Sequence, residues 1–195
     1  MRRALVLFSL ICGSAALAEP TKKESLLAKS GSAVPATWDR QLARRIGKPP
    51  PPLLNLRNIW TKETLAFEPK KGATAPEPVL SAFLRCHFTG EPTTMDARLF
   101  GVLVEAGLHF DAKRIDIVSG FRAPKYNLML RKKGHEVARD SQHTYGNAVD
   151  FRIPGVPTTR LLSWAKGLHL GGVGFYPDSQ FVHVDTGPVR FWEGK

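Results

Sequence analysis

The spacing of apolar residues changes several times along the chain, and each change predicts a different element. Apolar and polar residues alternate over residues 53–60 and again over Thr64-Leu-Ala-Phe67, which predicts a small hairpin. Helical spacing takes over in residues 79–86 and 96–106, and Thr93-Thr94 is a candidate N-cap for the second of these helices. The first half of the folded region is therefore predicted to hold both strands and helices.

The second half consists of shorter apolar runs bounded by Gly and Pro. Its predicted elements are strands at 115–118, 148–153, 173–176, 181–185 and 189–192, and helices at 124–133 and 158–168. Tight turns at Pro177-Asp178 and Gly187-Pro188 join the last three strands, and such turns favour antiparallel pairing. The predicted class is α+β, with a small central antiparallel β-sheet and flanking helices, not doubly wound α/β.

The N-terminus has the pattern of an export signal. Arg2-Arg3 precede an apolar stretch, and Ala16-Leu17-Ala18 supplies the small residues of a cleavage site, so residues 1–18 are predicted to be a signal peptide. The stretch is too short to span a bilayer comfortably. A lipoprotein would use Cys12, but the bulky Ile11 stands where a small residue is needed.

The rest of the chain divides into two parts. Residues 19–52 hold few large apolar residues and end in Pro49-Pro-Pro-Pro52, which predicts a leader or linker. Residues 53–195 are sufficient for one domain with a proper core. Export through the signal predicts a periplasmic protein. No later segment is apolar enough to cross a membrane, so no transmembrane helix is expected after cleavage.

The chain is strongly basic, with 28 Lys and Arg against 17 Asp and Glu and a formal net charge of +11. A basic exported protein suits anionic surfaces, and bacterial wall polymers carry many carboxylates and phosphates. Nucleic acid is the other usual partner for such charge. The basic residues are scattered, however, with a single run at Arg131-Lys132-Lys133, and no nucleic-acid motif is present. No nucleic-acid partner is therefore expected.

Signal cleavage would leave Cys86 as the only cysteine, so no intramolecular disulfide can brace the fold. A Cys86–His87 nucleophilic pair is disfavoured, because neighbours on a strand point to opposite faces. The simpler interpretation of Cys86 is a small buried apolar residue.

The candidate chemistry concentrates in two stretches, Ser141-Gln-His143-Thr-Tyr-Gly146-Asn-Ala148-Val-Asp150 and Phe181-Val-His183-Val-Asp185. Two imidazoles and a carboxylate are ligand types of a catalytic zinc ion, which takes three protein ligands and leaves a fourth position open. Strand alternation puts Asp150 and His183 on the faces opposite the apolar ones, so neighbouring strands would bring them together. Gly146 permits a sharp turn that lets His143 reach over the Asp150 strand.

Taken singly, each histidine has a simpler explanation. His143 could be a surface-loop residue, and His183 could be a half-buried strand histidine. Asp150 weighs against these explanations, because a carboxylate in the middle of an apolar strand is costly unless it is paired or bound to a metal. The combination of the three residues favours a metal site.

These two stretches, together with an earlier one at residues 119–127, resemble the zinc D-Ala-D-Ala peptidase superfamily, which shares its fold with the zinc domain of hedgehog proteins. Three elements carry the resemblance: Ser119-Gly-Phe-Arg-Ala-Pro-x-x-Asn127, Ser141-x-His143-x-x-Gly146-x-Ala148-x-Asp150, and Phe-Val-His183-Val-Asp-x-Gly187. The third element is similar to the periplasmic murein endopeptidase branch of that group. The resemblance covers about residues 53–192, with the specific motifs confined to 119–187.

The resemblance implies a zinc ion bound by His143, Asp150 and His183. It also implies that Arg122 binds a carbonyl or carboxylate of the peptide stem, and that Ser141 contacts substrate beside the metal. The physical chemistry agrees, because Arg is a rigid donor fork matched to carboxylates. Zinc would lower the pKa of its bound water and polarise the scissile carbonyl, and a basic residue nearby could stabilise the developing oxyanion.

The sequence departs from several relatives at the general base. Those relatives place an acidic residue three positions before the last ligand, or a histidine two positions before it. Here these positions hold Gln180 and Phe181, and neither takes a proton at neutral pH. Asp185, on the same strand face as His183, is the substitute candidate, with Asp178 second. Asp185 could instead be an outer partner that orients His183.

The predicted function is that of a zinc metallopeptidase, an endopeptidase or carboxypeptidase, acting on the stem peptides or cross-links of peptidoglycan. A monomer is expected. The sequence leaves open whether a D,D-cross-link, an L,D-cross-link or a terminal D-alanine is cut. The missing base motivates an alternative, a catalytically inactive zinc-containing domain that binds peptidoglycan. Tyr145, beside the motif glycine, is a candidate to line the cleft, whereas Trp192 is expected in the core.

Overall fold

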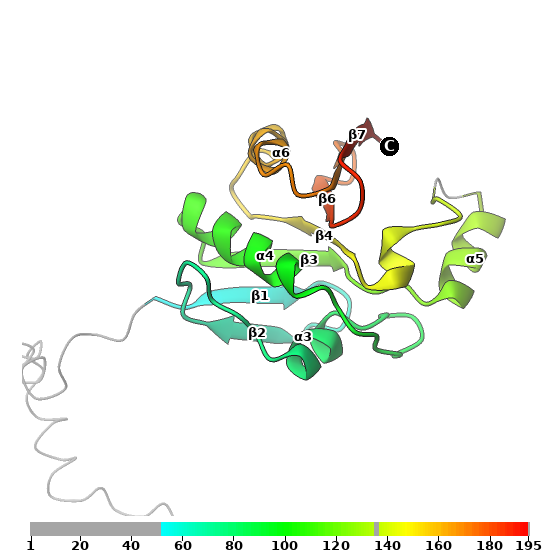
Figure 1. Cartoon of the computed structure of the whole chain (residues 1–195), viewed down its shortest axis with the longest axis horizontal. Coiled ribbons are helices and arrows are strands. Elements are labelled where there is room, and N and C mark those ends of the chain that lie inside the picture. Colours follow the sequence, from blue (N-terminus) through cyan, green and yellow to red (C-terminus); the bar gives the residue numbers. More distant parts are fainter. Residues whose placement is uncertain (1–51, 135–136, 195) are drawn as a thin grey trace, which may run out of the picture. The chain divides into compact units, whose positions relative to one another are not determined.

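The computed structural model of the protein describes residues 52–134 and 137–194, which form a sheet with helices packed around it (Figure 1). In chain order the elements are β1 (Leu54–Asn58), β2 (Thr64–Phe67), α3 (Glu77–Phe83), α4 (Ala97–His109), β3 (Arg114–Ser119), α5 (Pro124–Lys132), the 3-10 helix η1 (Gln142–Tyr145), β4 (Ala148–Arg152), α6 (Thr158–Gly167), β5 (Gly172–Tyr176), β6 (Phe181–Asp185) and β7 (Arg190–Glu193). Within this described part, no helix combines the length and apolar character that a bilayer span requires. The signal peptide and, apart from Pro52, the leader lie outside the described residues, so both stay predictions.

The sheet has seven strands in the order β2-β1-β3-β4-β6-β5-β7. The α+β class is confirmed, but the expected small antiparallel sheet is wrong, because β1 runs parallel to β3 and β5 runs parallel to β7. The chain passes through α3 and α4 before β3, and this long connection lets β3 return parallel to β1. At the other end β7 pairs with the free edge of β5 and not with β6, so the tight turn after β6 does not form a hairpin.

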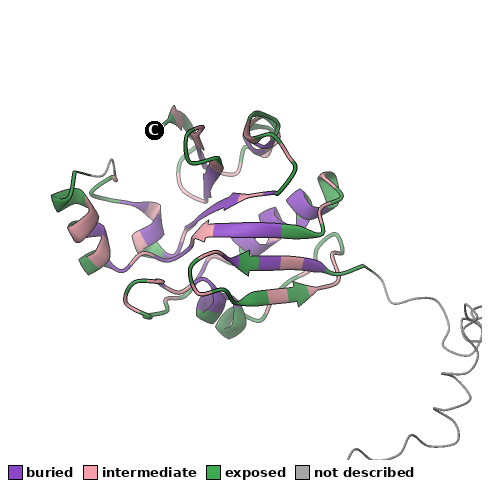
Figure 2. Ribbon diagram, turned by 180° about the vertical axis from the view of Figure 1, so that it is seen from behind, coloured by how far each residue is buried: buried purple, intermediate pink, exposed green. Residues whose placement is uncertain are grey.

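The core lies between the sheet and the helices that cover it. Leu99 and Leu103, one helical turn apart on α4, are buried in one hydrophobic cluster with Phe151 of β4 and Val182 of β6. Figure 2 shows that buried residues concentrate in the central strands. This packing fixes β4 and β6, the two strands that carry the predicted ligands Asp150 and His183.

Cys86 is a free, fully buried cysteine in the same cluster. The ring of the neighbouring His87 instead stacks on Trp60, with ring centroids 4.7 Å apart. Cys86 is thus a small apolar residue of the core, as expected, and forms no nucleophilic pair with His87.

Helix α4 begins at a different residue from the one that the sequence predicted. Asp96, and neither Thr93 nor Thr94, occupies the N-cap, and its side chain accepts a hydrogen bond from the backbone N–H of Arg98 at 2.9 Å. The backbone N–H of Asp96 bonds the carbonyl oxygen of Gly146 at 3.0 Å. The start of the helix is therefore fastened to the loop that carries His143.

Replacing Asp96 with alanine is expected to lower the free energy of unfolding by about 1–2 kcal/mol, because the cap and the ion pair with the exposed Arg98 are lost. Hydrogen bonds from Arg98 lower the pKa of Asp96 from 3.8 to about 2. A carboxylate with a lowered folded-state pKa adds stability above its unfolded pKa and loses it as the pH falls through the folded value. In urea titrations the difference between wild type and variant should therefore shrink as the pH falls from about 4 to about 2.

Asp96→Asn keeps a capping oxygen and is expected to lose less stability than the alanine variant. Equal losses in the two variants, or a difference that does not change with pH, would contradict this role for the carboxylate.

Candidate metal centre

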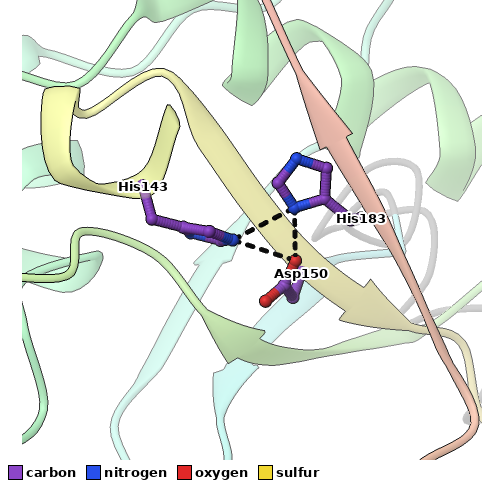
Figure 3. Close-up of side chains that lie close together, drawn as sticks. All are labelled: His143, Asp150 and His183. Atoms are coloured by element: carbon purple, nitrogen blue, oxygen red, sulfur yellow. Dashed lines mark hydrogen bonds and ion pairs between the residues drawn. The ribbon is translucent and has the colours of Figure 1, made fainter. Parts of the chain in front are cut away.

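Figure 3 shows the side chains of His143, Asp150 and His183 turned toward one another. They come from three elements, His143 from η1, Asp150 from the middle of β4 and His183 from β6. Asp150 and His183 are direct partners across the antiparallel pair β4 and β6. All three residues are buried. The fold thus brings together the three residues that the sequence nominates as metal ligands.

The three candidate ligand atoms form a small triangle. His143 Nε2 lies 3.1 Å from Asp150 Oδ1 and 3.1 Å from His183 Nδ1, and His183 Nδ1 lies 2.8 Å from Asp150 Oδ1. Donors at about 2.0–2.1 Å from a tetrahedral zinc ion stand about 3.3 Å apart, so a small outward shift would admit an ion. Two imidazole nitrogens and one carboxylate oxygen are a donor set that suits a metal ion, and these three residues could hold one.

The second nitrogen of each imidazole has a partner of its own. His143 Nδ1 lies 2.7 Å from the Gly120 carbonyl oxygen, and His183 Nε2 lies 3.0 Å from Asp185 Oδ2. A carbonyl and a carboxylate only accept hydrogen bonds, so these two nitrogens are assigned the ring protons. In the neutral form of each ring, the lone pairs of His143 Nε2 and His183 Nδ1 then face the centre of the triangle, which is the tautomer that a metal ligand needs.

The short helix η1 takes its shape from Gly146. This residue has φ 75°, in the left-handed region, and a Cβ there would collide with the carbonyl oxygen of Thr94. The backbone N–H of Arg122 bonds the His143 carbonyl oxygen at 3.1 Å and fixes the other side of the turn. The sharp turn predicted at Gly146 is confirmed, and it holds His143 over β4.

The protonation of the three groups follows from burial and mutual contact. Burial lowers the pKa of His143, despite the neighbouring Asp150. Burial opposes ionisation of Asp150, but His143 and His183 more than offset it and hold the pKa of Asp150 well below its usual range. Burial also acts to lower the pKa of His183, yet the bonds to Asp150 and Asp185 outweigh it and raise that pKa. Asp150 is therefore ionised, and a metal ion at the triangle would compete with a proton on His183.

Asp185 is fully buried and accepts hydrogen bonds at both oxygens. Its Oδ1 accepts from the backbone N–H groups of Gly172 and Gly187, each at 2.9 Å. Its Oδ2 accepts from His183 Nε2 at 3.0 Å and from the Arg190 guanidinium at 2.6 Å. Burial acts to raise the pKa of Asp185, but these bonds outweigh it and hold the pKa well below its usual range. Both oxygens of the Asp185 carboxylate are thus occupied by hydrogen-bond donors. The carboxylate contacts Nε2 of His183, whereas Asp150 contacts Nδ1 of the same ring.

A cleft of about 400 Å³ opens onto His143, Asp150 and His183. Arg122 and Ser141, the predicted substrate-binding residues, also line it. The Arg122 guanidinium lies 3.9 Å from Asp150 Oδ2 and 3.4 Å from Asn127 Oδ1. The remaining lining residues that the structure describes are Val137, Ala138, Asp140, Gln142, Tyr176, Phe181, Arg190 and Trp192. The cationic side chain of Arg122 therefore lies in the cleft beside the three candidate ligands, whereas Asp185 does not line the cleft.

Two other candidates from the sequence also lie outside this cleft. Asp178 is exposed in the turn between β5 and β6, and Tyr145 lines a neighbouring hollow. Conversely, the sequence missed Trp192, which was expected in the core but is only partly buried and lies with its ring centroid 5.0 Å from that of His183. Strand alternation on β7 could have suggested which of its residues share a face. It could not show which face meets the cleft, because that depends on the pairing with β5.

Comparison with known proteins agrees with the motif pattern. Residues 48–192 match the family described as Peptidoglycan L,D-endopeptidase MepK. The probable peptidoglycan L,D-endopeptidase MepK of Haemophilus influenzae is 40% identical over 154 residues, which cover 76% of this chain and 83% of the relative. Peptidoglycan L,D-endopeptidase MepK of Escherichia coli K12 is 36% identical over 151 residues, 75% of this chain and 83% of the relative. No solved structure matches the chain significantly. The chain therefore belongs to the murein endopeptidase branch of the zinc D-Ala-D-Ala peptidase superfamily, as its motifs predicted.

Proposed function

We propose that this protein is a zinc-dependent peptidoglycan L,D-endopeptidase that works in the periplasm. The observation that carries the proposal is the convergence of His143 Nε2, Asp150 Oδ1 and His183 Nδ1 at a cleft, with separations of 2.8–3.1 Å. The choice of the L,D-cross-link as the bond cut rests on the relatives, which are named for that activity. The location rests on the signal peptide predicted at residues 1–18 and on the position of peptidoglycan outside the inner membrane.

Zinc is the proposed ion because a catalytic zinc site takes three protein ligands drawn from His and carboxylates. Bound there, zinc would polarise the scissile carbonyl and lower the pKa of a bound water. His143, Asp150 and His183 would hold the ion, and the bonds to Gly120 and Asp185 would keep both imidazoles in the ligating orientation.

Arg122 is proposed to orient the substrate and to stabilise negative charge that develops on the scissile oxygen. Its side chain is only 12% exposed, lines the cleft and is held in place by Asn127. A fixed guanidinium in a largely buried site binds a carbonyl oxygen or a carboxylate more strongly than it would in water. Ser141, which is buried at the wall of the same cleft, is proposed to contact the substrate backbone.

Arg122→Lys is expected to lower kcat/KM for cross-linked muropeptides by about ten- to a hundred-fold. The lysine ammonium keeps the positive charge but lacks the two parallel N–H donors of the guanidinium. Zinc content should be unchanged, since Arg122 is not one of the ligands. Arg114→Lys is the matched control, because Arg114 pairs with Asp116 and does not line the cleft. A wild-type kcat/KM in the Arg122→Lys variant would remove Arg122 from the proposed machinery.

Asp185 is proposed to position His183 and not to act as the general base. A base must reach the substrate side of the site and must be free to take a proton. Asp185 has neither property, because its oxygens already accept from His183, Gly172, Gly187 and Arg190, and its pKa lies well below the usual range.

A second candidate function is a zinc-containing domain that binds peptidoglycan without cutting it. The saturation of Asp185 favours this candidate, together with Gln180 and Phe181 at the positions where several relatives hold a base. The two functions predict the same binding to purified wall but different products.

Digestion of purified peptidoglycan separates the two functions. Mass spectrometry of the muropeptides should show loss of L,D-cross-linked species with the wild type, no loss after chelator treatment, and recovery when zinc is added back. Binding to the wall without any change in the muropeptides, with zinc present, would reject the peptidase and favour the binding domain.

A further inference from the structure

A second hollow, of about 260 Å³, lies next to the metal cleft. One wall is a single face of α5, because its four lining residues follow the helical spacing i, i+3, i+4 and i+7. The lining residues are Pro124, Asn127, Leu128 and Arg131 from α5, and Arg139, Thr144 and Tyr145 from the opposite side. The two guanidinium side chains therefore come from different segments of the chain and border the same space.

The segment 138–140 contributes residues both to the hollow and to the metal cleft. Ala138 and Asp140 line the cleft, whereas Arg139 lines the hollow. Asn127 Nδ2 donates to the carbonyl oxygens of Ala138 and Arg139, at 3.0 and 3.4 Å, and Asn127 Oδ1 accepts from Arg122 at 3.4 Å. The segment that carries Arg139 is thus fastened to the arginine of the cleft.

The hollow has the chemistry of an anion site with apolar sides. None of its seven lining residues is acidic, and among the described residues no carboxylate forms an ion pair with Arg131 or Arg139. Leu128 and Tyr145 are 49% and 58% exposed, so their apolar surface is available to a ligand. Arg131 and Arg139 are exposed, as are the neighbouring Lys132 and Lys133, but of the basic run 131–133 only Arg131 lines the hollow.

We propose that this hollow binds a free carboxylate of the same cross-linked stem peptide whose scissile bond lies in the metal cleft. The inference rests on the proposed function. Arg131 and Arg139 supply two forks that match a carboxylate, and Leu128 and Tyr145 cover the aliphatic part of the residue that carries it. Cross-linked stems bear free carboxylates on residues flanking the cross-link, so a second anion subsite beside the cleft selects peptides of that kind.

The test compares cross-linked muropeptides with free carboxylates against the same compounds with those carboxylates amidated. Wild-type protein is expected to prefer the free acid by about ten-fold in kcat/KM, with the difference mainly in KM, as for loss of one charged hydrogen-bonded contact. The double variant Arg131→Ala/Arg139→Ala should lose this preference and act on both substrates at the rate that the wild type shows with the amide.

Lys125→Ala/Lys132→Ala is the matched control, because it removes the same charge from exposed positions of α5 outside the hollow. It should keep the preference, and Arg131→Lys/Arg139→Lys should keep part of it. Equal rates on acid and amide in the wild type, or a preference that survives in the alanine double variant, would overturn the inference.

Calorimetric binding of the same two muropeptides gives a readout that needs no turnover. A preference for the acid that the alanine variant loses supports the hollow even if the wild type cuts nothing, whereas equal binding of acid and amide rejects it. Absence of cleavage by the wild type alone rejects the proposed peptidase, so the two failures are distinguishable.

Discussion

Asp150→Asn is expected to reduce zinc-dependent cleavage of peptidoglycan by more than about a thousand-fold at neutral pH, because activation of water depends on the ion. Asparagine keeps the shape of the side chain, so the strand pair β4 and β6 should stay intact. The negative charge between His143 and His183 is lost, and a neutral amide oxygen is a much poorer zinc ligand. Zinc content and kcat/KM, measured on the same preparation, should fall together.

Asp116→Asn provides the matched control. Asp116 is another buried strand aspartate, but it pairs with Arg114 at 2.9 Å and does not line the cleft. Its replacement should lower stability and leave zinc content and cleavage close to wild type. Should Asp150→Asn retain both zinc and activity while staying folded, Asp150 is no ligand.

Asp185→Asn is expected to weaken zinc binding by about ten- to a hundred-fold, the usual effect of losing an outer partner of a ligating histidine. The carboxylate accepts from His183, Gly172, Gly187 and Arg190. An amide group has one acceptor oxygen and one donor nitrogen, so one set of these donors would face another donor at a buried position. Direct zinc titration against a competing chelator measures the change.

The same variant distinguishes a positioning residue from a general base. A positioning role predicts that saturating zinc restores most of the cleavage, because the ligand set itself is complete. A general base predicts unchanged zinc affinity and cleavage that stays lost when zinc is saturating. The second outcome would return Asp185 to the role of base that the sequence first suggested.

The cluster of His143, Asp150 and His183 was predictable because strand alternation and one glycine turn are local signals, and the assumption that the two strands are neighbours is met. Strand alternation placed Asp150 and His183 opposite the apolar faces of their strands, and those faces are buried as expected. The pairing of β4 with β6 then set the two side chains directly opposite each other. Gly146 fixed the turn that brings in His143, so three separate sequence signals describe one site.

Features set by distant pairing were not predictable in the same way. The tight turn after Asp185 is typical of a hairpin, yet β7 pairs with β5, and only that pairing carries Arg190 to the Asp185 carboxylate and Trp192 to His183. The sequence alone therefore could not show that both oxygens of Asp185 already accept hydrogen bonds. Likewise Asp96 caps α4 at a site where its backbone bonds Gly146, fifty residues away in sequence.

X-ray absorption spectroscopy of the zinc-loaded protein is the most direct test of the metal site, because it identifies the atoms around the ion without any need for turnover. The expected result is one zinc ion per chain with about four nitrogen and oxygen ligands near 2.0–2.1 Å, two of them imidazoles. The imidazole signal should be reduced or lost with the ion in His183→Ala. Zinc bound without imidazole, or an unchanged spectrum in His183→Ala, would contradict the site.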